Sequence, residues 1–464
     1  MEMKEDELLQ PVSPTAQSMN SFVRSISLIA VLEFEIAIDE HKFMSFAKDL
    51  IHLNPLFTSI MVNDVNGERK WKKVEVNIEE HIIVHTPPSN LSLQLFDAYF
   101  NEYMTNYALQ ELPQNKPLWE IHIINCPTNN AAGNLVFKIH HSLGDGYSLM
   151  GVLISSMTRA HDPSLPLTFP SRKVKLEQSG HILGRVYQFL LSSMNTVLDF
   201  GGNMMKSSVL EDHLTPIRSG GDGVEFRTFA IRTITFSLHH IKKIKAKLGV
   251  TINDVITGMI FLGLRLYMQE TRPDSTNSNS TALVLINTRM VENYKSVQDM
   301  LKPNNSNAPW GNRFALLHID IPKATDCELS NPLQFIKAAQ KMIKRKRYSS
   351  AVFLVGKLME MIHKLRGPEV AAKFMYKTAQ NTSLSISNMM GPREKMAMCG
   401  HPVKGVYFTV VGIPQSLMIT VISYMEQLRI TLLSEKEFID EEKLTSCIEK
   451  AFENIHEASM ELSI

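Results

Sequence analysis

Hydrophobic and polar residues alternate most regularly near the end of the first third of the chain. Residues 134–140 place apolar side chains at every second position, as a half-buried β-strand does. From Leu149 to Met157 the apolar residues recur at helical spacing instead. We therefore expect a tight strand-to-helix turn between them. A turn of this kind can present side chains to a ligand while the strand and the helix fix their positions.

Similar patterns predict strands and helices that alternate along most of the chain. Apolar runs and alternations predict strands at 25–38, 71–76, 117–124, 134–140, 227–237, 283–289, 314–321, 384–392, 406–411, 417–424 and 428–433. Helical spacing predicts helices at 39–51, 92–112, 239–248, 251–267 and 440–462. Strands 117–124 and 134–140 are expected to form a hairpin. The pattern over residues 25–76 predicts a β-α-β beginning.

The chain is long enough for two domains. Its 464 residues exceed the roughly 250–300 residues at which a single core stops growing. Residues 1–21 are acidic and then contain Pro and Ser, and we expect a flexible N-terminal arm without the apolar run of a signal peptide. We expect an N-terminal domain at 22–160, a linker at 161–223 and a C-terminal domain at 224–464.

Two segments are candidates for contact with a membrane. Residues 186–198 carry no charge but are shorter than the roughly 17–25 residues of a spanning helix. They fit either an amphipathic helix that lies on a bilayer or covers a cleft, or a soluble helix between domains. The basic run at 341–347 fits either a solvated helix face or a contact with an anionic membrane or a phosphate. The pattern leaves these alternatives open.

Composition narrows the possible functions. Hydrophobic residues make up 44% and charged residues 20%, as in an ordinary folded protein, and the net charge of +1 gives no general case for nucleic-acid binding. The four Cys lie far apart without metal-ligand spacing, which suits a reducing compartment. No P-loop or dinucleotide-binding glycine fingerprint is present in the sequence.

The strand-to-helix turn concentrates residues with catalytic chemistry. It contains His140, His141 and Asp145, with Gly144 and Gly146 beside the acid. A His can accept and return a proton near neutral pH and so act as a general base. The alternative is a buried His with a backbone partner. Asp145 could orient the turn through an ion pair or hydrogen bonds. A zinc site is not expected, because zinc needs three or four ligands and no Cys pair or third His is nearby.

Asn253 and Asp254 form a second polar pair, at the start of the helix predicted from residue 251. Thr251 and Asp254 have the spacing of a capping box, which would satisfy backbone groups at the helix start. Alternatively, Asn253 and Asp254 face a cleft and contact substrate or brace the turn. Spacing alone does not separate the two.

An ordered set of motifs resembles one family of enzymes. His140-His141-Ser142-Leu143-Gly144-Asp145-Gly146 matches the His-His-x-x-x-Asp-Gly pattern of chloramphenicol acetyltransferase-like acyltransferases. With Pro117-Leu118-Trp119-Glu120, Asn253-Asp254, Asn287-Thr288-Arg289 and Ser387-Asn388-Met389-Met390-Gly391-Pro392, the chain resembles plant-type bifunctional wax ester synthase/diacylglycerol acyltransferases. The Met389-Met390 pair departs from the smaller apolar residues expected there, so chain-length preference is not carried over.

The resemblance implies a fold, a reaction and a location. The fold would be of the α/β class, with two chloramphenicol acetyltransferase-like domains of mixed sheets flanked by helices, and the turn would lie at a channel between them. Acyl-CoA would be the co-substrate and a fatty alcohol or diacylglycerol the acceptor, with no metal or other cofactor. Such substrates imply a membrane surface, and the family resemblance implies the cytosolic side of the endoplasmic reticulum or plasma membrane.

The resemblance also implies roles for individual residues. His141 would be the general base, Asp145 a brace of the turn held by an Arg, and His140 a supporting residue. Asn253 is our candidate for stabilising the oxyanion. The candidate substrate contacts are Gly146, Trp119, Asp254, Arg289, Ser387 and Asn388.

Two other functions remain open from the sequence. One is an acyltransferase for a soluble alcohol or amine. The other is a non-catalytic lipid-binding protein of the same fold.

Overall fold

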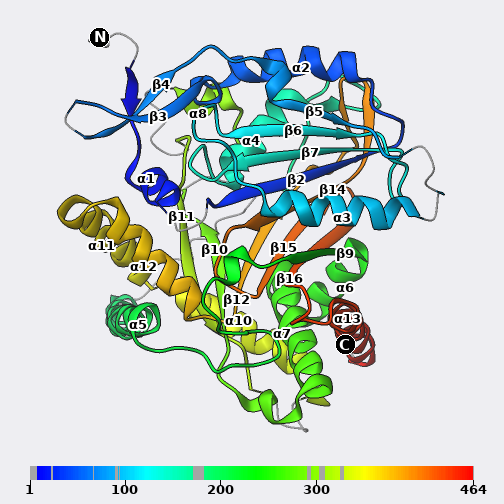
Figure 1. The fold of residues 1–464 in the computed structure, drawn as a ribbon. Helices are drawn as coiled ribbons and strands as arrows, with labels where there is room; N and C mark the ends of the chain where they lie inside the picture. Colours follow the sequence, from blue (N-terminus) through cyan, green and yellow to red (C-terminus); the bar gives the residue numbers. More distant parts are fainter. Residues whose placement is uncertain are drawn as a thin grey trace.

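The computed structural model describes residues 8–21, 25–65, 67–88, 92, 95–170, 182–289, 294–302, 309–323, 329–347 and 349–462. Two large mixed sheets dominate the fold, and helices flank both of them (Figure 1). The first sheet lies in the upper half of the view and the second in the lower half. This arrangement confirms the predicted α/β class with mixed sheets.

Within the described residues, the first sheet has seven strands in the order β5-β6-β7-β2-β14-β13-β8. Their bounds are β2 (Ser27–Phe34), β5 (Ile82–His85), β6 (Trp119–Ile124), β7 (Gly133–His140), β8 (Thr158–Arg159), β13 (Met396–Met398) and β14 (His401–Val411). β6 and β7 pair antiparallel with Trp119 opposite Ile139, which confirms the predicted hairpin. A small sheet of order β1-β4-β3 joins β1 (Leu8–Pro11), β3 (Ser59–Asn63) and β4 (Arg69–Lys73).

Over the same part of the chain, the second sheet has six strands in the order β11-β10-β12-β15-β16-β9. Their bounds are β9 (Phe229–Ser237), β10 (Thr281–Asn287), β11 (Phe314–Asp320), β12 (Leu384–Met390), β15 (Leu417–Tyr424) and β16 (Gln427–Glu435). β12 runs parallel to both β10 and β15, and the other pairs are antiparallel.

Helices cover these sheets and connect their strands. The helices are α1 (Pro14–Asn20), α2 (Glu40–Leu53), α3 (Phe96–Leu109), α4 (Gly146–Ser156), α5 (Ile182–Ser208), α6 (Leu238–Leu248), α7 (Ile252–Thr271), α8 (Val297–Leu301), α10 (Leu333–Arg347), α11 (Ala351–Arg366), α12 (Pro368–Gln380) and α13 (Glu441–Glu461). α7 is buried from Asp254 to Met268. A Cβ on Gly258 would lie 2.6 Å from Cα of Ile336 in α10, so only a glycine allows the two helices to approach this closely.

The N-terminal segment corrects one prediction. β1 pairs with β4, and Ser13 caps α1 with Pro14 at its first position. Ala16 and Met19 of α1 are buried. The described residues 8–21 are therefore packed into the fold. The prediction of a flexible arm is wrong for them, because their apolar side chains are buried in the protein core.

The sequence-based domain boundaries also need correction. β13 and β14 follow the second-sheet strand β12 in the chain, yet both belong to the first sheet, where β14 pairs with β2 from Val403 to Val411. The chain then returns to the second sheet as β15. Residues 396–411 therefore belong to the part of the molecule built on the first sheet, because β13 and β14 are strands of that sheet. We call this part the first half, and the part built on the second sheet the second half.

Part of the predicted linker is a long helix. α5 spans the segment 186–198, and its backbone is helical throughout, but the side chains before residue 195 lie outside the described ones. Residues 171–181 of the predicted linker also lie outside the described residues. α5 packs beside α11 and α12, at the left of Figure 1. Among the described residues no single helix has the length and hydropathy of a membrane span; the sharply bent pair α6 and α7 meets those criteria only when both are taken together.

Candidate active site

The strand-to-helix turn lies where the two halves of the chain meet. β7 ends at His140 and α4 begins at Gly146, as the pattern predicts. Asp145 caps α4, because its Oδ1 accepts a hydrogen bond of 3.0 Å from the backbone N–H of Ser148. His141 is fixed through its backbone N–H, which donates to the carbonyl of Ile26 at 2.9 Å. The turn is thus held by local and distant backbone contacts.

His141 is paired with Asn312, a residue that no sequence motif singled out. Nδ2 of Asn312 donates to the carbonyl oxygen of His141 at 2.8 Å, and Oδ1 lies 2.9 Å from the ring Nδ1. A carbonyl can only accept, so the amide group beside it must be the NH2 group, and Oδ1 must face the ring. Nδ1 therefore carries the proton. In the neutral imidazole, Nε2 is then the basic nitrogen.

The surroundings of His141 keep its ring neutral. Its residue is 6% exposed, and burial lowers the pKa of His141, against the opposing effects of the Asp145 charge and the Asn312 hydrogen bond. The imidazole is therefore in its base form at neutral pH. His141 also lines a large cavity, and Asn312 occupies Nδ1, so Nε2 is the ring nitrogen available to a ligand.

His140 has a different environment, as the sequence alternation predicted. Its Nδ1 accepts from the backbone N–H of Ser142 at 3.0 Å and lies 2.6 Å from the Ser142 hydroxyl. The residue is fully buried, and burial lowers its pKa to about 3. It is absent from the lining of the cavity. His140 is therefore a neutral residue that shapes the turn.

Asp145 and Arg289 form a buried ion pair across the two halves. Nη1 of Arg289 lies 2.7 Å from Oδ2 of Asp145, and their side chains are 1% and 7% exposed. The same Oδ2 accepts from the backbone N–H of Arg313 at 2.8 Å. Both carboxylate oxygens are thus engaged by protein groups. The predicted Arg partner of Asp145 is present.

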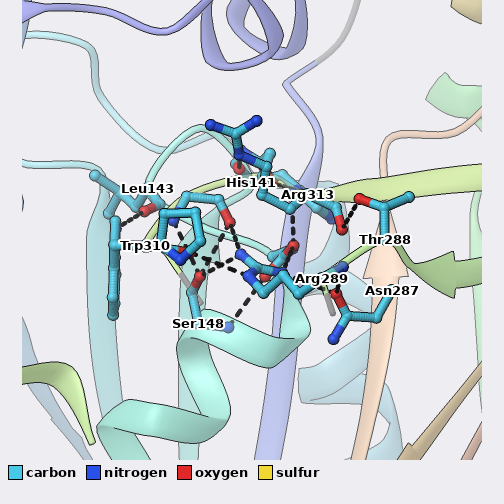
Figure 2. A network of polar contacts seen from close by, with 12 residues as sticks. His141, Leu143, Ser148, Asn287, Thr288, Arg289, Trp310 and Arg313 are labelled. Atoms are coloured by element: carbon cyan, nitrogen blue, oxygen red, sulfur yellow. Dashed lines mark hydrogen bonds and ion pairs between the residues drawn. The ribbon is translucent and has the colours of Figure 1, made fainter. Parts of the chain in front are cut away.

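Arg289 also fixes the segment that carries Asn312. Its guanidinium donates to the carbonyls of Pro309 and Gly311 and to the hydroxyl of Ser148. Trp310 donates from Nε1 to the Leu143 carbonyl of the turn at 2.7 Å (Figure 2). Arg289 does not line the cavity. The prediction of Arg289 as a substrate contact is therefore corrected: its donors are consumed in bracing the turn.

The cavity beside His141 has a volume of about 1240 Å³ and is lined by residues of both halves. Gly146, Ser387 and Asn388, predicted as substrate contacts, all line it. So does Asn253, whose Oδ1 accepts a hydrogen bond of 2.9 Å from Nδ2 of Asn388. The structure thus brings Asn253 and Asn388 to the same cavity as His141.

Two further predicted contacts have structural roles. Asp254 completes the capping box: its Oδ2 accepts from the Thr251 N–H at 2.8 Å while its own N–H donates to the Thr251 hydroxyl. Its residue borders the cavity as well. Trp119 is 1% exposed, donates from Nε1 to the Phe57 carbonyl and does not line the cavity. The prediction of Trp119 as a substrate contact is corrected, because the residue is part of the core.

Across the residues that the structure describes, no three His, Cys, Asp or Glu side chains gather as a metal site requires.

The structure consists of two mixed sheets flanked by helices, with His141 at the cavity between them. A solved wax ester synthase/diacylglycerol acyltransferase from Marinobacter aquaeolei VT8 superposes with a TM-score of 0.61 at 16% identity, covering 97% of this chain and 100% of the other. The first condensation domain of the calcium-dependent antibiotic synthetase gives 0.57 at 12% identity, covering 96% and 94%. At these identities the likeness shows the fold, which confirms the predicted class.

Sequence comparison identifies the family. A wax ester synthase/diacylglycerol acyltransferase catalytic domain matches residues 65–256, and the WS/DGAT C-terminal domain matches residues 310–456. Together the two domains of this family match well over half of the chain. The protein therefore belongs to the wax ester synthase/diacylglycerol acyltransferase family, and it is an O-acyltransferase.

Curated relatives match over nearly the full chain. Wax ester synthase/diacylglycerol acyltransferase 4 of Arabidopsis thaliana is 29% identical over 466 residues, which cover 94% of this chain and 87% of the relative. Wax ester synthase/diacylglycerol acyltransferase 9 of the same plant is 28% identical, covering 99% and 98%.

Proposed function

We propose that this protein transfers a fatty acyl group from acyl-CoA to the hydroxyl of a long-chain alcohol or of diacylglycerol, with His141 as the general base. The observation that carries the proposal is the His141–Asn312 pair, which makes Nε2 the basic nitrogen of a neutral ring beside the cavity. A general base needs this combination of protonation state and access.

The reaction is an acyl transfer in which His141 returns the proton that it takes. Nε2 accepts the proton of the acceptor hydroxyl while the oxygen attacks the thioester carbonyl carbon. The carbon–sulfur bond then breaks, and the departing coenzyme A sulfur receives the proton from Nε2. The products are an ester and free coenzyme A. Asp145 takes no part in proton transfer, since Arg289 and backbone N–H groups engage its carboxylate.

Asn253 is our candidate for stabilising the oxyanion of the tetrahedral intermediate. It lies in the first turn of α7, which the capping box fixes, and its Oδ1 is held by Asn388. Its Nδ2 is then available as a donor toward the cavity. A fixed amide donor costs little reorganisation when charge develops on the carbonyl oxygen.

The lysine side chains that line the cavity support acyl-CoA, which is an anion, as the acyl donor. Lys242 and Lys245 of α6 and Lys344 of α10 line the cavity. Lys242 pairs with Glu426 at 2.9 Å, whereas Lys245 and Lys344 have no acidic partner within 4 Å among the described residues. Coenzyme A carries several phosphate charges, which such lysines attract. We assign these two lysines to the coenzyme A end of the donor.

The remaining lining supports a lipid acceptor. Much of the cavity wall is aliphatic or aromatic, including Leu28, Ile286, Ile386, Phe408 and Leu428. An apolar wall favours an alkyl chain over a water-soluble alcohol or amine.

We assign the delivery of such substrates to a surface made by α5 and α11, which pack against each other. Every exposed residue of the chain from Val197 to Leu210 is uncharged, and Val197 is 71% exposed. On α11, Leu354, Met361 and Leu365 form an exposed stripe beside the exposed Lys357 and Lys364. Apolar side chains flanked by lysines fit the interface of an anionic membrane. The surface would place the protein at a lipid bilayer, as expected for an enzyme of the endoplasmic reticulum or plasma membrane.

The test is ester formation from radiolabelled palmitoyl-CoA with hexadecanol and, separately, with diacylglycerol. The wild type is expected to form at least one of the two esters, and His141→Ala to lose that activity by a factor of 10² or more, roughly as for other general bases. His239→Ala, on an exposed residue of α6, is the matched control. Equal activity of His141→Ala and the wild type would refute the base assignment. No ester with either acceptor would refute the proposed substrates.

A further inference from the structure

A second hollow of about 60 Å³ lies between α4 and the first sheet. We call it the side pocket. It is bounded by α4, by α2 and by the strands β7, β2, β13 and β14 of the first sheet. Met389 of β12 and Ile422 of β15, from the second sheet, complete its walls. Apart from Gly146 and Ser156, its walls are Ala, Val, Ile, Leu, Met and Phe side chains, and no charged residue lines it. Such a pocket can hold an apolar group and offers a polar group almost no partner.

The side pocket adjoins the large cavity next to the catalytic turn. Leu28, Gly146, Met389 and Phe408 line both spaces. Gly146 directly follows Asp145 and is the first residue of α4. A chain that has its reacting end at His141 would therefore have access to the side pocket from the large cavity.

Met389 stands at this junction. A Cβ built on Gly146 would lie 2.6 Å from Sδ of Met389, so the methionine side chain packs directly on the bare backbone of Gly146. A thioether side chain has three rotatable bonds and repacks easily. Met150 and Met398 also line the pocket, which gives its walls further adaptability.

Helix α4 sets the depth of the side pocket. The helix runs from Gly146 at the entrance, and Leu149, Leu153 and Ser156 line the pocket along its successive turns. Ten residues of α-helix rise about 15 Å, which is comparable to a chain of roughly a dozen methylenes. The volume of about 60 Å³ is small for such a chain, so Met389 and its neighbours must repack for it to enter.

We infer that the side pocket binds the far part of one substrate's alkyl chain, with Met389 controlling entry and the Leu153–Ser156 end limiting chain length. This inference rests on the proposed function, which places the chain's reacting end at His141. The ligand chemistry is a saturated alkyl chain. It could belong to the acyl donor or to the alcohol, and the experiment distinguishes these two sources.

The experiment measures kcat/KM in two series. In one, lauroyl- to arachidoyl-CoA are tested with hexadecanol fixed; in the other, dodecanol to eicosanol are tested with palmitoyl-CoA fixed. Ser156→Phe fills the far end of the pocket. Excluding two methylenes costs about tenfold in affinity, so the long-to-short ratio should fall about tenfold in one series. Met389→Ala should raise the same ratio. The series in which this ratio changes identifies the substrate whose alkyl chain enters the side pocket.

Controls separate this inference from folding and from the proposed function. Thr158→Phe adds the same ring at an exposed position just beyond α4 and should leave both ratios unchanged. Leu153→Phe replaces Ser156→Phe if the latter does not fold, as judged by thermal unfolding. Unchanged ratios in both series, with a folded Ser156→Phe or Leu153→Phe enzyme that forms ester, would overturn the side-pocket inference alone. A wild type that forms no ester would overturn the proposed function.

Discussion

The amide of Asn312 holds His141 at two points, with Oδ1 at 2.9 Å from the ring Nδ1 and Nδ2 at 2.8 Å from the residue's own carbonyl oxygen. The two contacts fix both the tautomer and the orientation of the ring. Asn312 belongs to the second half of the chain, so the basic nitrogen depends on the docking of that half. Groups that orient a catalytic or metal-binding imidazole in this way typically contribute about 10–100-fold to function.

Asn312→Ala should therefore lower kcat about 10–100-fold and leave the KM values nearly unchanged. Asn312→Asp should retain the Nδ1 contact and add a negative charge, which raises the pKa of His141. Its kcat/KM should then fall at neutral pH and recover as the pH rises. An Asn312→Asp enzyme with the wild-type pH profile would show that Asn312 acts only on the fold.

Loss of Asp145 should destabilise the protein. Asp145→Ala leaves the buried guanidinium of Arg289 without its carboxylate, which costs about 3–5 kcal/mol for a buried pair. Urea denaturation measures the change. Asp299→Ala is the control: it removes an exposed carboxylate that pairs with Lys302, and an exposed pair contributes little to stability. Equal effects of the two substitutions would contradict the bracing role.

Acid should destabilise the protein through His318. This β11 residue is 3% exposed, and neither ring nitrogen has a hydrogen-bond partner among the described residues. Burial lowers its pKa to about 3, so between about pH 6.5 and 3 the unfolded state binds the proton and the folded state does not. Stability should therefore fall as the pH falls through this window. His140, with its pKa also near 3, acts in the same direction.

His318→Leu should remove part of that dependence and raise the melting temperature at pH 5 more than at pH 8. Thermal unfolding at the two pH values measures the difference. His239→Leu changes an exposed residue and should leave the dependence of the melting temperature on pH unchanged. If the melting temperature of His318→Leu depended on pH as that of the wild type does, groups other than His318 would cause the acid sensitivity.

Charge reversal at Lys245 should weaken the use of acyl-CoA. Lys245→Glu places a negative charge where we locate the coenzyme A phosphates, and we expect the KM for acyl-CoA to rise roughly fivefold, about 1 kcal/mol, with kcat little changed. The effect should shrink at high salt because salt screens exposed charges. Lys243→Glu, an exposed residue of the same helix that does not line the cavity, is the matched control. Similar KM values for the two variants would place the phosphates elsewhere.

Acidic residues on the α11 stripe should detach the protein from membranes. Met361→Asp with Leu365→Asp removes two exposed apolar side chains and adds two negative charges. Since burying one such side chain is worth about 1.5–3 kcal/mol, binding to phosphatidylserine-containing vesicles should fall at least tenfold in flotation. Val65→Asp makes a similar change at a 95% exposed residue of the first half and should have little effect. Undiminished flotation of the double variant would exclude this surface.

The sequence was most informative where chemistry and local pattern coincide. The strand, the turn and the helix around His141 follow from residues close together in the chain, and so does the capping box of Asp254. Asn312 could not be found this way, because it contacts a residue 171 positions away and the Trp310-Gly311-Asn312 stretch has no periodic pattern. Arg289 was found as a motif residue but given the wrong partner, because its polar groups could face substrate or Asp145 equally well.

Two other predictions were wrong because the local sequence pattern allowed two structures. Alternation shows that Trp119 lies on one face of a strand, but it does not say whether that face meets a cavity or a core. Residues 8–21 have the composition of a loose arm, yet Ser13-Pro14 is a helix-start signal and the apolar residues after it are buried. In each case tertiary packing decided between two locally acceptable structures.

The path of β14 has a consequence for how the protein is made. β2 lies at the centre of the first sheet, between β7 and β14, and β14 ends only at Val411. While the ribosome synthesises the chain, β2 can pair with β7 early, but its other edge stays open until most of the second half has emerged. An open strand edge is prone to pair with other chains. Nascent chains should therefore depend on chaperones until late in synthesis, and a gene split between the two halves should yield fragments that fold only together.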